Sequence, residues 1–226
     1  MRFALPGWGT ALSGRPAASI FDLGDRALMV DLSGGTPAAL NARARALARL
    51  LQRRRDVEEA VIGYASVTVH FDPEETDAER LRSSISRGLK APSPDQVPGR
   101  LHRIPVIYDG PDLADCADRL GLDVAELVRL HSATTYRCFM LGFVPGWGYL
   151  GPLPASLRLA RRSVPRTRVP AGSVAMAEDL TGVYPIACPG GWHLIGRTSL
   201  PLFLPGSGSP AVLQAGDRVR FQPVDR

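Results

Sequence analysis

The chain has 226 residues, of which 45% are hydrophobic, and its formal net charge is +5. That length and hydrophobicity allow one large domain or two small ones and exclude a generally disordered chain. The basic excess is too small to require a nucleic-acid partner, and no window approaches the roughly 20 apolar residues of a membrane span.

Strands and helices alternate in the first half of the chain. In chain order, the patterns predict two strands within 18–33, a helix over 37–55, two strands within 57–72 and a helix over 77–89. The first helix is indicated by Leu40, Ala44, Leu47 and Leu51, which recur every three or four residues. The order ββαββα predicts a small α+β sandwich.

A proline-rich stretch, KAPSPDQVPG, follows the second helix and is typical of a linker. We therefore expect a first domain over 1–92, in which 1–18 is an N-terminal extension, a linker over 93–100 and a second domain over 101–226. The second domain begins with a strand at LHRIPVIYD and two short helices, 111–120 and 123–132. Beyond Thr135, short apolar runs alternate with glycine and proline, which predicts a β-barrel or β-sandwich.

Several chemistries lose support from the residue inventory. Lys90 is the only lysine and lies in the linker region, so neither a Walker-type phosphate loop nor a covalently bound biotin is expected. Cys116, Cys138 and Cys188 show no paired short spacing, so we predict no metal site and no disulfide framework. We expect reduced thiols, no signal peptide and a cytoplasmic location.

Unusual residues gather in segments 130–137, 142–151, 161–174 and 181–198. Two of these segments carry proline and glycine beside a tryptophan, Trp147 and Trp192. Glycine allows close approach of the backbone, proline fixes it, and tryptophan supplies a flat wall. The arginines between the two tryptophans offer planar donors for carboxylate or phosphate, so a rigid pocket that binds anions is predicted.

Each candidate also has a purely structural interpretation. The tryptophans can simply fill the hydrophobic core, and Arg161 and Arg162 can be solvated surface residues. His131 either interacts with the last carbonyls of a helix or acts as a general base. Ser173 lacks the elbow pattern of a nucleophilic serine and has no evident partner base. Spacing alone therefore indicates a pocket but no reaction.

The segments YRCFMLGFVPGWGYL, PRTRVPAGSV, TGVYP and CPGGWHLIGRT resemble, in this order, the KipI-type proteins. This family is also called the B-type subunit of 5-oxoprolinase or allophanate hydrolase subunit 1 and is related to carboxyltransferases. IPVIYDGPDL, LHSATTY and GDRVRFQPV fit the same family. The resemblance covers roughly residues 19–224 and is specific, because several long motifs occur in the family's order.

The resemblance implies a small α+β domain followed by a cyclophilin-like β-barrel. It implies two partners, a larger KipA-type protein that forms the C-type subunit and a protein that forms the A-type subunit, with ATP-dependent hydrolysis of 5-oxoproline to glutamate. Because the chain has no nucleotide loop of its own, we expect it to contribute part of a composite site for ATP and a small amide substrate. Two alternatives stay open: a subunit that processes urea- or allophanate-type amides, and an inhibitor of a sensor histidine kinase.

From the residue types in these segments together with the resemblance, we expect catalytic roles for His131, Arg166 and Arg168. The expected substrate-binding residues are Tyr136, Phe143, Pro145, Gly146, Trp147, Ser173, Thr181, Tyr184, Pro189, Gly190, Gly191, Trp192 and Arg197. The two tryptophan segments would border one cleft, with Arg168 and Arg197 facing it and His131 at its edge. Leu180 stands where the family commonly has glutamine, which leaves a different amide substrate open.

Overall fold

The computed structural model describes residues 17–90 and 99–225. Contacts divide the chain into two compact units, Met1–Asp95 and Gln96–Arg226, which are described separately below. Nearly all of the expected N-terminal extension and most of the expected linker lie outside the described residues. Among the described residues, no helix is long and apolar enough to cross a membrane.

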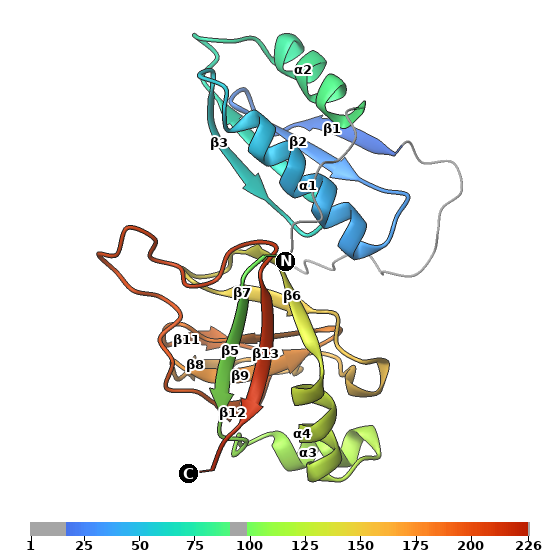
Figure 1. Ribbon diagram of the computed structural model, residues 1–226, viewed down its shortest axis with the longest axis vertical. Helices are drawn as coiled ribbons and strands as arrows, with labels where there is room; N and C mark the ends of the chain where they lie inside the picture. Colours follow the sequence, from blue (N-terminus) through green and yellow to red (C-terminus); the bar gives the residue numbers. More distant parts are fainter. Residues whose placement is uncertain (1–16, 91–98, 226) are drawn as a thin grey trace. The chain divides into compact units, whose positions relative to one another are not determined.

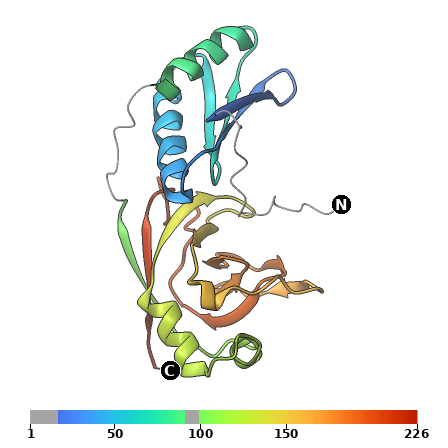
Figure 2. The same cartoon turned by 90° about the vertical axis from the view of Figure 1, so that its right-hand side faces the viewer.

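The first unit is a four-stranded antiparallel sheet with two helices. Its elements are β1 (Ala18–Asp22), β2 (Ala27–Leu32), α1 (Pro37–Leu51), β3 (Val57–Ile62), β4 (Ser66–Phe71) and α2 (Ala78–Lys90). The strand order is β1-β2-β4-β3, and α1 packs on β3, β4 and α2. Figure 2 shows α1 running alongside one face of this sheet. The predicted ββαββα order and α+β class are confirmed.

Local sequence explains where the first helix begins and ends. The Thr36 side chain accepts a hydrogen bond from Ala39 N, and Pro37 occupies the first turn, where its missing N–H is harmless. The helix ends at Leu51 rather than at the predicted Arg55. Beyond it Arg54 binds Asp56 instead of continuing the helix, with Nε 2.9 Å from Oδ1. This charged turn leads directly into β3.

The second unit is built around a seven-stranded sheet that almost closes on itself (Figure 1). Its elements are β5 (Leu101–Val106), α3 (Leu113–Leu120), α4 (Val124–Ala133), β6 (Thr135–Leu141), β7 (Gly148–Gly151), a 3-10 turn (Ala155–Leu157), β8 (Arg166–Val169), β9 (Ser173–Ala177), β10 (Leu180–Val183), β11 (Cys188–Gly190), β12 (His193–Arg197) and β13 (Arg218–Pro223). The strand order is β12-β9-β10-β7-β6-β13-β5, and β8 pairs with β11 in a separate ribbon.

A bridge between Ile107 and Arg197 joins the two end strands of the sheet, so the predicted β-barrel is confirmed. Its interior is filled by side chains from nearly every strand, and all five residues of β9 are buried. Helices α3 and α4 lie together at one end of the barrel (Figure 1). Helix α4 directs Leu127 and His131, four residues apart on one face, into the core.

Candidate functional site

A cavity of about 270 Å³ lies beside the loop between β6 and β7 and is walled mainly by aromatic side chains. We call it the aromatic cavity. Trp147 and Trp192 both line it, with ring centroids 5.0 Å apart in an edge-to-face arrangement. Tyr184 packs against Trp147 with a centroid distance of 4.6 Å. The prediction that the two tryptophans lie near one concave surface is therefore confirmed.

One residue with a positive φ lies in the wall of this cavity, and another lies near it in the turn between β9 and β10. Phe143 and Glu178 are the non-glycine residues with positive φ in the described chain, at 66° and 57°. Phe143 lines the cavity and is 60% exposed, and Glu178 forms a 3.3 Å ion pair with the cavity residue Arg161. Bulky residues adopt positive φ rarely, and such outliers cluster at functional sites. The strained backbone marks the aromatic cavity as a functional candidate.

Glycine is required at two positions around this cavity. Gly146 has φ of 82°, and a Cβ there would lie 2.8 Å from Phe203 Cβ. At Gly190 a Cβ would collide with the Tyr184 ring. These positions show why the proline-glycine-tryptophan segments carry glycine: only a residue without a side chain lets the aromatic walls pack this closely.

A second cavity, of about 340 Å³, is lined by arginines, and we call it the basic cavity. Arg166, Arg168 and Arg197 line it, and buried Ser173 contributes to its wall. Arg197 holds Asp109 through Nε and Nη2, at 3.1–3.2 Å. Arg168 is exposed, and no carboxylate in the described part of the chain pairs with it. An exposed guanidinium of this kind is suited to bind a carboxylate or phosphate.

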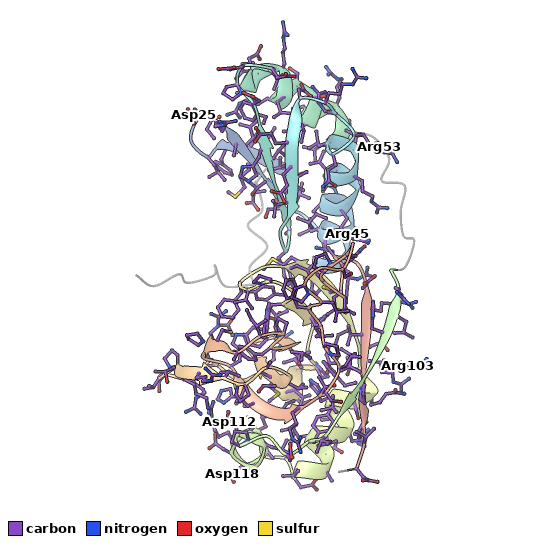
Figure 3. The ribbon with its side chains drawn as sticks, turned by 90° about the vertical axis from the view of Figure 1, so that its left-hand side faces the viewer. Asp25, Arg45, Arg53, Arg103, Asp112 and Asp118 are labelled. Carbon is purple, nitrogen blue, oxygen red and sulfur yellow. The ribbon has the colours of Figure 1, made fainter. Side chains whose placement is uncertain are left out.

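Asp112, labelled in Figure 3, lies at the start of α3 and contacts one arginine from the lining of each cavity. Its Oδ1 accepts hydrogen bonds from Arg162 Nη1 at 3.1 Å and from Arg166 Nη2 at 2.7 Å, and its Oδ2 accepts one from Leu194 N at 2.7 Å. Arg162 lines the aromatic cavity and Arg166 lines the basic cavity. A single buried carboxylate thus fixes one guanidinium in each cavity.

The electrostatics of this cluster favour an anion nearby. Burial acts to raise the pKa of Asp112, but the hydrogen bonds from Arg166 and Leu194 N and the charges of both arginines hold that pKa below its ordinary value. The carboxylate is therefore ionised at neutral pH. Two guanidinium charges face one carboxylate charge, which leaves the cluster with a net positive charge between the cavities.

His131 does not lie at the edge of either cavity, so its expected position is wrong. The side chain is fully buried, stacks on Phe221 at 4.7 Å, and is bonded through Nδ1 to Tyr108 Oη and through Nε2 to Thr181 Oγ1. Thr181 Oγ1 donates to Ala175 O, so it accepts from the His131 Nε2–H. Burial lowers the pKa of His131 to about 3. A neutral ring without access to a cavity is poorly placed for general-base chemistry.

The other expected site residues divide into four groups. Those that line the aromatic cavity are Phe143, Trp147, Tyr184, Pro189, Gly190, Gly191 and Trp192; those that line the basic cavity are Arg166, Arg168, Ser173 and Arg197. Tyr136 and Thr181 are instead fully buried around His131, where Tyr136 Oη donates to His131 O at 2.9 Å. Pro145 and Gly146 shape the loop that carries Trp147 but line neither cavity.

Sequence reasoning missed Asp112 altogether and left Arg162 as a solvated residue. An aspartate just before an apolar helix is ordinarily interpreted as an N-cap. Asp112 makes no such side-chain capping bond and turns to the arginines instead. The motif IPVIYDGPDL, which contains it, was the available signal.

Two further expectations bear on the site. Leu180 is buried, packs beside Gly151 and lines neither cavity, so the leucine leaves both sets of walls unchanged. Among residues 17–90 and 99–225, no group of three or more histidine, cysteine, aspartate or glutamate side chains is arranged to hold a metal ion.

Comparison with known proteins places this geometry in a family. Residues 18–213 match the model of the carboxyltransferase domain, subdomain C and D. The B-type subunit of 5-oxoprolinase from Escherichia coli O157:H7 is 40% identical over 209 residues, which cover 91% of this chain and 96% of that protein.

Two solved structures share the fold. The structure of TTHA0988 has a TM-score of 0.80 and 36% identity; the match covers 89% of this chain but only 40% of that longer chain. The Kluyveromyces lactis urea carboxylase has the same fold, with a TM-score of 0.73 and 20% identity over 92% of this chain and 22% of its own. The chain belongs to the family of the carboxyltransferase domain, subdomain C and D.

Proposed function

We propose that this chain is the B-type subunit of an ATP-dependent 5-oxoprolinase, which forms glutamate from 5-oxoproline together with a KipA-type protein as its C-type subunit and a further protein as its A-type subunit. The relative at 40% identity bears the name of the 5-oxoprolinase B-type subunit and is matched over nearly its whole length. The observation that carries the proposal is the pair of cavities linked by Asp112. One cavity offers flat aromatic walls, and the other offers arginines.

The two cavities suit the two parts of this chemistry. The aromatic cavity has room for a small planar ring, because tryptophan and tyrosine faces stack on flat groups. An amide carbon is a poor electrophile, and transfer of the γ-phosphoryl group of ATP to the amide oxygen, with release of ADP, activates it. Water then adds at that carbon, the ring C–N bond breaks so that the nitrogen leaves as the amine, and the acyl phosphate of glutamate is left. A second water releases phosphate from this acyl phosphate and gives glutamate. Negative charge develops on the transferred group, and Arg166 and Arg168 are positioned in the basic cavity to stabilise it.

The residues present fit the phosphate end of ATP but not the whole nucleotide. Arg168 is exposed without a carboxylate partner in the described chain, and Arg166 lines the same basic cavity, where Asp112 holds it in place. Guanidinium groups placed in this way are donors for phosphate oxygens. The chain has no glycine-rich loop followed by lysine that would cradle the remaining phosphates. We therefore place the rest of the nucleotide on a partner protein, in a composite site.

Reconstitution tests this proposal. The chain is co-expressed with candidate C-type and A-type subunits from the same genome, and glutamate and ADP are measured after addition of 5-oxoproline and ATP. We expect glutamate only when all three proteins and ATP are present. Arg168→Ala should remove most of the turnover, while Arg158→Ala, which changes an exposed arginine outside both cavities, should not. A well-assembled complex without glutamate formation would refute the proposal.

The amide-processing alternative is tested with the same complex. The shared fold with a urea carboxylase is the observation behind it. Urea and allophanate are offered in place of 5-oxoproline, and ATP consumption is compared. Urea and allophanate lack a ring to fill the aromatic cavity, so we expect 5-oxoproline to be preferred. Preference for either acyclic amide would favour the alternative.

A further inference from the structure

The outer wall of the barrel carries four arginines on three adjacent strands, away from both cavities. Arg103 lies on β5, Arg218 and Arg220 lie on β13, and Arg137 lies on β6. Arg220 is directly paired with Arg103 across the parallel β13–β5 ladder, and Arg218 with Arg137 across the antiparallel β13–β6 ladder. We call these four residues the outer arginine face.

Strand alternation puts all four side chains on the same side of the sheet. Successive side chains on a strand point to opposite faces, and residues directly paired across a ladder share a face. Val219 and Phe221, which alternate with the arginines of β13, are buried in the barrel core. Figure 3 shows the Arg103 side chain pointing away from the barrel. The outer arginine face therefore gathers four cationic side chains on one side of the sheet, of which Arg103 and Arg220 are exposed and Arg137 and Arg218 are half-buried.

The charge of this face is not compensated within the described chain. Several other arginines of the second unit pair with a carboxylate, for example Arg119, Arg129 and Arg161. The four arginines of the outer face form no ion pair within residues 17–90 and 99–225. Like charges placed directly opposite on paired strands are destabilising, so this arrangement costs free energy that an anionic partner would recover.

The surface beside these arginines is also hollowed. Beside Arg220, a hollow of about 550 Å³ lies between α4 and β13, lined also by Arg103, Arg129 and Gln222. Glu126, the acidic residue next to this hollow on α4, is already held by both donors of Arg129 at 2.7 Å.

We propose that the outer arginine face docks an acidic surface of a partner protein in the 5-oxoprolinase complex. This inference depends on the proposed function, because it takes its partner from that assembly. The paired positions extend over roughly 10 Å across three strands, since neighbouring strands lie about 4.8 Å apart. Such a compact patch is small for a nucleic acid, which typically engages about 6–10 phosphates. Leu101 and Pro105 share the outer side of β5, and arginine mixed with apolar residues is typical of protein interfaces.

The test is a charge reversal on the outer arginine face. The chain carrying Arg103→Glu and Arg220→Glu is compared with the unchanged chain for binding to the co-expressed C-type and A-type subunits. Assembly is followed by size-exclusion chromatography, and binding rates are measured on a surface at low and high salt. We expect binding at least about tenfold weaker, with most of the loss in the association rate and a smaller dependence on salt. The control carries Arg119→Glu and Arg158→Glu, which change the net charge equally on exposed residues elsewhere in the unit, and should bind as the unchanged chain does.

The outcomes separate this inference from the proposed function. If the unchanged chain assembles and the reversed chain assembles equally well, the docking face is refuted while the proposed function stands. If the unchanged chain binds neither partner, both fall. Should the reversed chain fail to fold, Arg103→Gln with Arg220→Gln removes the charge without adding carboxylates and must still weaken assembly. A third outcome would also overturn the proposal: the unchanged chain co-purifies with nucleic acid, the reversed chain does not, and both chains assemble equally well with the partner subunits.

Discussion

Two buried polar clusters in the second unit differ in the charge of their partners. Asp112 is held by two guanidinium groups and a backbone N–H, and those guanidiniums line the aromatic and basic cavities. His131 is held by two hydroxyl groups, stacks on Phe221 and reaches neither cavity. One cluster is ionic and borders solvent, and the other is neutral and closed.

The difference shows what keeps each cluster in place. A buried charge persists only when it is paired and hydrogen-bonded, so the ionised Asp112 requires its arginines and fixes them in return. A buried histidine avoids the desolvation cost by staying neutral, and its ring then serves packing and local hydrogen bonds. The residues that can act on a substrate therefore surround the carboxylate rather than the histidine. Four predictions test this contrast.

The largest loss of stability is expected from Asp112→Ala. Removing the carboxylate leaves Leu194 N–H and two partly buried guanidiniums without their acceptor, which costs about 3–5 kcal/mol of unfolding free energy. Urea unfolding of the two proteins measures this directly. Asp112→Asn keeps an acceptor for Leu194 N and should lose less. Equal stability of Asp112→Ala and the unchanged chain would contradict the ionic role.

His131→Ala should cost somewhat less, about 2–4 kcal/mol. The change opens a cavity next to Phe221, removes the acceptor of the Tyr108 hydroxyl and removes one of the two hydrogen bonds of Thr181. His131→Phe retains the stacked ring and should lose less than the alanine variant. Thermal and denaturant unfolding provide the measurement. A histidine that acted only in catalysis would show the opposite pattern: lost turnover with unchanged stability.

The pH dependence of stability isolates the neutral histidine. Burial lowers the pKa of His131 from its ordinary 6.5 to about 3, so the unfolded chain takes up a proton in this range that the folded chain does not. The contribution of His131 is thus fully present above pH 6.5 and is lost as pH falls toward 3. Between about pH 7 and about pH 5 the loss amounts to roughly 2 kcal/mol. His131→Phe should lack this part of the slope, and an unchanged slope would show that the imidazole is solvated.

Arg168→Ala should have the smallest effect on stability. The side chain is exposed and no carboxylate in the described chain pairs with it, so the free energy of unfolding should change by no more than about 0.5 kcal/mol. The same urea titrations give the value. A loss comparable to that of Asp112→Ala would mean that Arg168 is structural and not available to a ligand.

Patterns of short range predicted most of the fold and part of the site. Helix periodicity, strand alternation and turn residues located the elements of both units because each signal lies within a few neighbouring residues. The tryptophan segments were recognised for the same reason. Helix α1 was predicted too long because the arginines after Leu51 also favour a helix. In the structure, Arg54 instead bonds to Asp56 beyond the end of the helix.

The missed and misplaced residues depend on contacts distant in sequence. Asp112 meets Arg162, Arg166 and Leu194 across separations of 50, 54 and 82 residues, which no local pattern encodes. His131 was expected at the cleft because of its residue type. Its burial depends instead on which face of α4 packs against the end of the barrel. Residue chemistry indicated which side chains can act, and only the fold shows which of them reach a cavity.

Turnover of the assembled complex by two variants tests the central claim most directly. Arg168→Ala and His131→Phe are each reconstituted with the C-type and A-type subunits, and glutamate formation is measured per mole of folded complex. Because Arg168 lies in the basic cavity and His131 is enclosed in the core, we predict a loss of at least about tenfold for Arg168→Ala and near-normal turnover for His131→Phe. Full turnover with Arg168→Ala and strong loss with His131→Phe would contradict the account and place the chemistry at the histidine.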